Sequence, residues 1–283
     1  MAVAVSKLST GNGNQSHSQS VNVSGLTSPH DFTSFMSPAV GDTFLLVSFG
    51  DENSLATIGT ITVTWDPTGT NQAMTLIGSG GTLHSATGVN LMYGLVNPTT
   101  GAKNLRIAWT GTSGSIEVVS ITFTGTVTTS VAAATYGYAN AASPTGADLQ
   151  AKVTSASAIA TGDMWFSCTY QNGVDPSPWF NFPAGTAGGG TAGTAYEFDA
   201  NQGYVPYWHY GSGAGATVTA EADPVGNCDW TKNIVGIAAA ATGDTFANET
   251  RVLAMKHSSM TGWMRDPRTR IFRPPPRRWR PDP

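Results

Sequence analysis

Two acidic residues in the segment Tyr196–Asn201 (YEFDAN) are the first candidates for catalysis. Glu197 and Asp199 lie two residues apart, so on a β-strand both side chains point from the same face. Retaining glycosidases need two carboxylates about 5 Å apart, one as nucleophile and one as acid. Sandwich-fold glucanases place them in an E-x-D-x-x-E strand motif, but here the third position is Gln202. We therefore interpret the pair as solvated acidic side chains near a sheet edge.

The other residue types that catalyse reactions or bind metals are not spaced for either task. No two histidines have the spacing of helical metal ligands (His17, His30, His84, His209 and His257). Cys168 and Cys228 form neither a metal-ligand pair nor a redox motif, and we interpret both as buried apolar thiols whose pairing is left open. Phosphate-binding, nucleophile-elbow and calcium-loop motifs are missing too. We predict no enzymatic activity, no cofactor and no metal site.

Two loops concentrate aromatic side chains. One holds Trp179 and Phe180, and the other holds Tyr204, Tyr207 and Trp208. Three interpretations are open: these rings cap one end of the core, anchor a protein interface, or stack on sugar rings. Large aromatic side chains favour partial burial, so capping of the core is the favoured interpretation. The same five residues are the candidates for an interface or glycan site.

The last stretch of the chain, Arg265–Pro283 (RDPRTRIFRPPPRRWRPDP), has a composition of its own. Its prolines exclude a regular helix or a central strand, so we predict an extended, polyproline-like arm. Residues 1–250 hold five basic and sixteen acidic side chains, a formal −11, whereas residues 251–283 hold nine basic and two acidic ones, a formal +7. The candidate partner-binding residues are Arg268, Arg270, Phe272, Arg273, Arg277, Arg278, Trp279 and Arg280.

Three interpretations of this arm are open. Arginines with Phe272 and Trp279 can bind nucleic acid through phosphate contacts and base stacking, but the acidic remainder of the chain opposes this. A second interpretation is a disordered tail. We favour the third, a peptide that docks on a neighbouring subunit, because Pro-rich segments lose little entropy on docking.

The elements that must position these residues are strands. Charged residues make up only 11% of the chain, and a sheet can present Thr, Ser and small residues to water where a helix needs charged ones. Residues 60–65 alternate between apolar and Thr side chains, and the apolar residues of 89–95 and 105–109 also share one face. Asp42–Phe49 is a continuous apolar run that predicts a strand buried on both sides. The pattern predicts an all-β fold.

The favoured architecture is a single antiparallel two-sheet sandwich, a jelly roll, over residues 1–241, followed by a linker and the basic arm over 242–283. A faint internal echo keeps a second architecture open, in which 1–130 and 131–241 are two similar halves. Gly41-Asp42 opens one apolar strand, and Gly162-Asp163 opens another 121 residues later. No apolar run reaches the roughly 18 residues of a membrane span. The first residues lack the basic flank and apolar segment of a secretory signal, so we expect synthesis in a cytoplasm.

Several stretches together carry a family resemblance: AMTLIG from Ala73, LMYGLVNPTTGAKNLRIAWTGT from Leu91, IEVVSITFTGT from Ile116, the Gly162-Asp163 strand and the closing NIVGIAAAA. The chain resembles the concanavalin-A-like jelly-roll proteins encoded by tailed phages and prophages, which are common among virion structural genes. The segment RIFRPPPR is similar to the short R-x-F-x-[VP]-P-x-R tails of some phage structural proteins. The resemblance implies a virion role and carries over no catalytic residue.

These observations favour a structural accessory of a bacteriophage virion: a capsid decoration, head spike, collar or tail-fibre subunit attached by protein–protein contacts. The expected partners are other virion proteins and further copies of this chain, because a sheet surface this poor in charge gives little protection against association. No membrane contact is expected, and nucleic acid is disfavoured. The alternative is a module that binds a carbohydrate or receptor on the host surface, since the fold alone does not determine function.

Overall fold

The structure is a computed structural model of the whole chain, which separates into a body, Met1–Ala240, and a second unit, Ala241–Pro283. All described residues belong to the body, so the predicted arm lies outside them. The structure describes residues 2–8, 27–51, 53–82, 88–114, 116–126, 137–141, 151–172, 180–181, 195–197, 204–224 and 229–240.

The strands up to Thr126, which we call the first half, form two antiparallel sheets. The first central sheet has the order β1 (Ala4–Leu8), β9 (Ile116–Thr124), β3 (Asp42–Asp51), β7 (Val89–Val96), β6 (Thr75–Thr82). The first outer sheet has the order β2 (His30–Met36), β8 (Lys103–Trp109), β4 (Ile61–Trp65), β5 (Gln72–Ala73). A single helical turn, α1 (Leu55–Ile58), connects β3 to β4.

The strands from Gly137 onward, the second half, form two more antiparallel sheets. The second central sheet has the order β10 (Gly137–Ala141), β17 (Asp229–Ile237), β12 (Met164–Asn172), β15 (Tyr204–Ser212), β14 (Ala195–Glu197). The second outer sheet has the order β11 (Ala151–Thr154), β16 (Thr219–Pro224), β13 (Phe180–Asn181).

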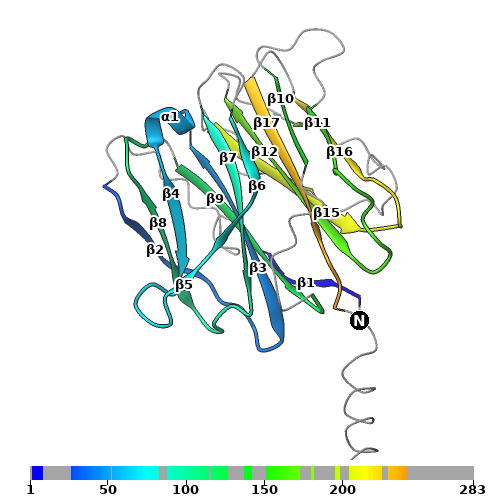
Figure 1. Cartoon of the computed structure of the whole chain (residues 1–283), viewed down its shortest axis with the longest axis horizontal. Helices are drawn as coiled ribbons and strands as arrows, with labels where there is room; N and C mark the ends of the chain where they lie inside the picture. Colours follow the sequence, from blue (N-terminus) through cyan, green and yellow to red (C-terminus); the bar gives the residue numbers. More distant parts are fainter. Residues whose placement is uncertain are drawn as a thin grey trace, which may run out of the picture. The chain divides into compact units, whose positions relative to one another are not determined.

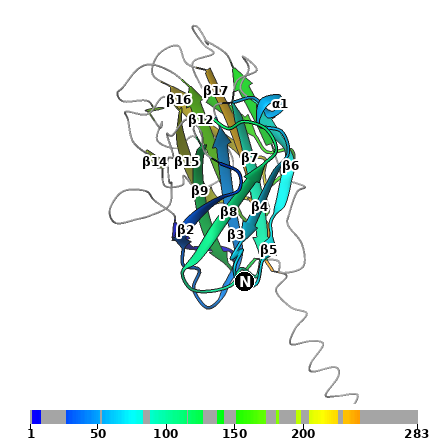
Figure 2. The same cartoon turned by 90° about the vertical axis from the view of Figure 1, so that its left-hand side faces the viewer.

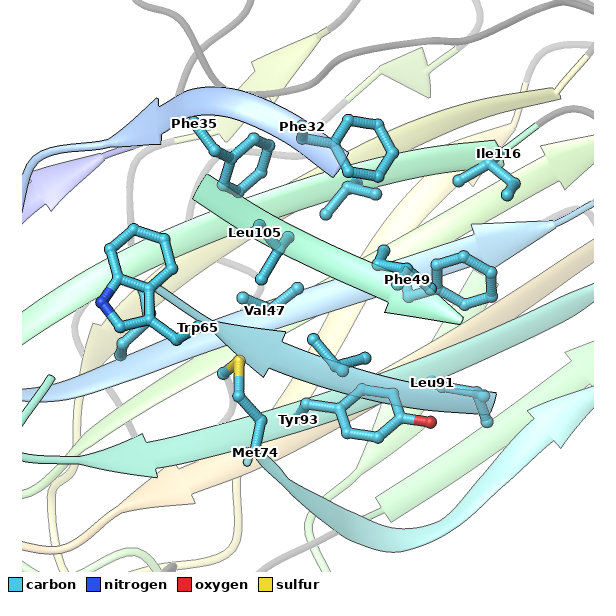
Figure 3. Close-up of a cluster of buried hydrophobic side chains, with 14 of the residues drawn as sticks. Phe32, Phe35, Val47, Phe49, Trp65, Met74, Leu91, Tyr93, Leu105 and Ile116 are labelled. Atoms are coloured by element: carbon cyan, nitrogen blue, oxygen red, sulfur yellow. The ribbon is translucent and has the colours of Figure 1, made fainter. Parts of the chain in front are cut away.

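The four sheets stack as four layers, with the two central sheets face to face (Figures 1 and 2). A first core, with Phe32, Phe49 and Trp65, lies between the first outer and first central sheets (Figure 3). A middle core, with Phe44, Phe166 and other buried residues, joins the two central sheets. A third, smaller core lies between the second central and second outer sheets. The predicted all-β class is confirmed, but the described strands form four sheets instead of the two that we expected.

Period-two alternation explains how one strand serves two cores. Leu45 and Val47 of β3 point into the first core, whereas Phe44 and Leu46 point into the middle core. The predicted burial of this strand on both sides is therefore confirmed. β9 behaves in the same way, because Val118 belongs to the first core and its neighbour Val119 to the middle core.

The two halves repeat one strand order. Along the chain, β1, β2, β3, β7, β8 and β9 take the same sheet positions as β10, β11, β12, β15, β16 and β17. The turns that open β3 and β12 also match. The amide of Asp42 donates to the oxygen of Ala39 at 3.2 Å, and that of Asp163 donates to Ala160 at 3.1 Å. The glycines before them have φ of 97° (Gly41) and 94° (Gly162), a backbone region that favours glycine. The repeated Gly-Asp pair noted in the sequence therefore corresponds to two equivalent turns.

A glycine in β3 allows the central sheets to approach closely. A Cβ added to Gly50 would overlap the ring of Tyr170 on β12, which is itself fully buried. We expect Gly50→Ala to lower the free energy of unfolding by about 2–3 kcal/mol, because the ring and both backbones are held in close-packed layers. Urea denaturation would measure the loss. If the overlap is its cause, the double variant with Tyr170→Leu should lose clearly less than the sum of the two single variants. An additive loss would contradict this packing.

Candidate functional site

A buried polar network connects the two halves. Asn90 of β7 is fully buried, and its Nδ2 donates to the backbone oxygens of Cys168 at 3.1 Å and of Thr231 at 3.3 Å. In return, Nδ2 of Asn233 donates to the backbone oxygen of Asn90 at 2.8 Å. Tyr170 adds a hydroxyl that donates to the oxygen of Ser48 at 3.1 Å. Such directional bonds inside an apolar core fix the register of one half against the other.

The thiol of Cys168 is part of this buried region and is not set up for chemistry. The side chain is a free thiol, fully buried in the middle core. Burial raises the pKa of this thiol to about 12, which keeps it protonated and unreactive at neutral pH. The prediction of a buried apolar thiol is confirmed for Cys168, whereas Cys228 lies outside the described residues.

A lysine is buried on the other face of the second central sheet. Lys232 of β17 is 1% exposed, and its Nζ donates to the hydroxyl of Thr169 at 2.7 Å. Burial lowers the pKa of this amine to about 7, and the charge of Glu221 opposes the shift only in part. Glu221 itself pairs with Lys152 at 3.1 Å. An ammonium in this position is poorly compensated, so Lys232 makes the stability of the second half sensitive to pH.

The other cations of the body are also engaged. Nε and Nη2 of Arg106 donate to the carboxylate of Asp31 at 2.6 and 2.7 Å, and this bond holds the pKa of Asp31 below its usual value. Lys103 pairs with Asp66 at 3.3 Å, and Lys7 donates to a backbone oxygen. With Lys152 and Lys232, this accounts for all five basic side chains of residues 1–250. Each of these cations already has a partner within the body.

Strand ends from both halves meet at one end of the body, which we call the junction end. The amide of Val3 donates to Gly162 at 2.8 Å, and the amide of Ala240 donates to Gly125 at 2.8 Å. The amide of Ala239 donates to Oδ1 of Asp163, also at 2.8 Å. The described body therefore begins and finishes at the same end (Figure 1).

Comparisons with known proteins reveal no relative. No family model, no curated protein and no solved structure matches this chain.

In the part of the chain that the structure describes, the His, Cys, Asp and Glu side chains form no group of three or more that could hold a metal ion. The same residues contain no helix long and apolar enough to cross a membrane.

The structure changes the interpretation of one predicted aromatic residue. Trp208 is 1% exposed and packs in the middle core, so it cannot stack on a sugar or anchor an interface. It lies on β15, between β12 and β14, and Tyr210 of the same strand also packs against the middle core. The prediction that Trp208 takes part in an interface or glycan site was wrong. The other interpretation, in which its ring belongs to the core, is the correct one for this residue.

The remaining predicted site residues are only partly placed. The backbones of Phe180, Tyr204 and Tyr207 belong to β13 and β15, and that of Glu197 to β14. Trp179 and Asp199 lie outside the described residues. So do the arm residues Arg268, Arg270, Phe272, Arg273, Arg277, Arg278, Trp279 and Arg280. Sequence inspection missed Asn90 and Lys232, which carry no motif and acquire their roles only from the packing of sheets.

Proposed function

We propose that the protein is a structural, non-enzymatic accessory of a bacteriophage virion, attached through protein–protein contacts. This role includes a capsid decoration, a head spike, a collar protein or a tail-fibre subunit. The protein would be made in the host cytoplasm, would bind other virion proteins and would act as a homo-oligomer. The family resemblance of residues 1–241 supports this role, as does a body built from closely packed, cross-bonded sheets.

One observation carries the proposal. Residues 251–283 have a formal charge of +7, and residues 1–250 have a formal charge of −11 with all five cations engaged inside the body. The net negative charge of residues 1–250 on every neighbouring copy therefore complements this basic, Pro-rich segment. Opposite charges speed such an encounter, and buried aromatic side chains then hold the peptide. These features suit an arm that links subunits on a particle.

We also propose that each half is a jelly roll. An eight-stranded jelly roll pairs its first, eighth, third and sixth strands in one sheet and its second, seventh, fourth and fifth in the other. The first half follows this order as β1-β9-β3-β7 and β2-β8-β4-β5, if β5 and β6 count as one strand that changes sheet. The second half follows it as β10-β17-β12-β15 and β11-β16-β13, with β14 added to the edge of β15.

The carbohydrate- or receptor-binding alternative is less well supported. It rested on two aromatic segments that we expected to be loops, but Tyr204, Tyr207 and Trp208 lie on strand β15, and the burial of Trp208 removes one of the two tryptophans. Trp179, Phe180, Tyr204 and Tyr207 stay as its candidates. Glycan binding that depends on Trp179 would favour this alternative over the structural role.

Deletion of Arg265–Pro283 tests the role of the arm. We expect the truncated protein to bind particles stripped of this protein at least about tenfold more weakly, because Phe272 and Trp279 are lost as anchors together with seven arginines. Binding of the full-length protein should weaken as salt rises, whereas residual binding of the truncated protein should respond less.

The melting temperature is the control for this deletion. An unchanged melting temperature together with weaker binding would support an intermolecular arm. Equal binding by both forms would rule out the arm as an anchor, and a lower melting temperature with unchanged attachment would show that the arm packs on its own body.

A further inference from the structure

We infer that the second outer sheet is a pH-responsive layer. When Lys232 takes up a proton, this sheet separates from the second central sheet far enough to admit water, while the first half stays packed. The change differs from global unfolding, because only the third core is exposed. It concerns the body alone and does not depend on the proposed virion role.

Lys232 lies under the second outer sheet. Ile234, its neighbour along one face of β17, belongs to the third core, whereas Val235 on the other face belongs to the middle core. β17 itself lies between β10 and β12, and β11 packs against it (Figure 1). Among the described elements, the second outer sheet is therefore the layer that keeps water from this amine.

The third core is the smallest of the three cores among the described residues. Its buried side chains are Val153, Ile159, Trp165, Val218, Ala220 and Ile234. Less apolar surface therefore enters water when this sheet lifts than when either of the other two pairs of sheets separates.

The matching site of the first half shows that the fold does not require a lysine here. Phe44 and Met164 open β3 and β12 with side chains in the middle core, and five residues further on these strands carry Phe49 and Thr169. Phe49 pairs with Val118 on β9, as Thr169 pairs with Lys232 on β17.

An apolar pair thus fills the first core where the second half has a buried amine and a hydroxyl. Burial of a cation costs stability. The second half carries this cost at a position where the repeated fold accepts valine, which indicates a role other than stability.

The charged groups around Lys232 do not neutralise its ammonium. Glu221 of β16 already pairs with Lys152 of β11 at 3.1 Å. Cys168 lies on the other face of β12, in the middle core, and Tyr138 of β10 is opposite Asn233, the next residue of β17. Burial therefore dominates and lowers the pKa of Lys232 to about 7, against smaller opposing effects of Cys168 and Glu221.

The pH range of the opening follows from two protonation states. With the sheet closed, the pKa of Lys232 is about 7, and with water admitted it returns toward the ordinary value of 10.5. The open state therefore binds more protons between these values, so a fall in pH favours opening. From pH 9 to pH 7, the equilibrium constant for opening should rise at least about tenfold, and below pH 7 it should level off.

Matched cysteine probes test this inference. Val153→Cys places a thiol in the third core and Val63→Cys places one in the first core, at residues that are 3% and 2% exposed. Both would be made in a Cys228→Ser background, in which the buried Cys168 of the middle core reports global unfolding. Labelling rates would be divided, at each pH, by the rate of a free cysteine peptide with the same reagent.

We expect the corrected rate at position 153 to rise at least about tenfold from pH 9 to pH 7. At pH 7 it should exceed the corrected rates at position 63 and at Cys168 at least about tenfold. Lys232→Met should abolish the rise at position 153. Ala220→Cys, on β16 in the same core, is a second probe and should behave like Val153→Cys.

Two results would overturn the inference. Corrected rates at position 153 and at position 220 that do not change with pH, or that change equally in the Lys232→Met variant, would show that this amine does not control the layer. Labelling of position 153, position 63 and Cys168 at one common rate would show that the third core opens only when the whole body unfolds.

Discussion

Asn90→Asp should lower the free energy of unfolding by roughly 3–5 kcal/mol at neutral pH. The substitution keeps the shape of the side chain but replaces the donor Nδ2 with an oxygen. That oxygen would face the backbone oxygens of Cys168 and Thr231, now 3.1 and 3.3 Å from Nδ2. The new carboxyl group must either ionise in a buried site whose one side-chain donor, among the described residues, is the hydroxyl of Ser48, at 3.5 Å, or take up a proton, and both are costly. Urea denaturation monitored by tryptophan fluorescence would measure the loss.

Asn104→Asp is the matched control for this substitution. Oδ1 of Asn104 accepts the amide of Ser34 at 2.9 Å near the surface, and an aspartate can accept the same bond. We expect a change below about 0.5 kcal/mol, as for most surface substitutions. If the two variants were equally stable, Asn90 would not lie between packed halves, and the four-layer arrangement would be wrong.

The stability of the protein should rise with pH between about 7 and 9 because of Lys232. The amine has a pKa of about 7 in the folded state and an ordinary value of 10.5 when exposed, so the unfolded chain binds more protons in this range. A rise in pH therefore favours the folded state, by roughly 2 kcal/mol over the interval. Above pH 9 the rise flattens, because the Cys168 thiol, with a pKa raised to about 12 from an ordinary value of 9.0, ionises first in the unfolded chain and opposes the effect of Lys232.

Two methionine substitutions separate this effect from all other titrations. Lys232→Met should remove the rise between pH 7 and 9, whereas Lys152→Met should keep it, because the side chain of Lys152 is 47% exposed. Denaturant midpoints measured across this range would give both profiles. A Lys232→Met variant with the wild-type slope would show that the buried amine is not the group responsible.

The local structure could be predicted from the sequence because alternation in a strand is a local property. Ile61, Val63 and Trp65 face the first core as their spacing indicates, and the apolar run of β3 correctly predicted two buried faces. The number of layers could not be predicted in this way. Which sheet covers which face depends on pairings between distant strands, such as β1 with β9.

The polar residues of the middle core explain why the central interface was missed. Asn90, Asn233 and Ser48 resemble water-facing positions in a strand, yet all three are fully buried. Asn233 bonds to Asn90 across the two sheets, and the hydroxyl of Ser48 donates to Oδ1 of Asn90 within the first central sheet. The burial of Lys232 could not be predicted from the sequence either, because a lone lysine in a strand is normally solvated. Trp208 could be assigned to the core or to a surface only once the position of its strand in the second central sheet was known.

The most direct test of the proposed virion role is quantitative mass spectrometry of particles purified from the phage that encodes this chain, combined with electron microscopy of the same particles. We expect the protein to be present at a fixed number of copies per particle, in a symmetric arrangement. Its absence from washed particles, or a copy number that varies between preparations, would contradict the proposed structural role.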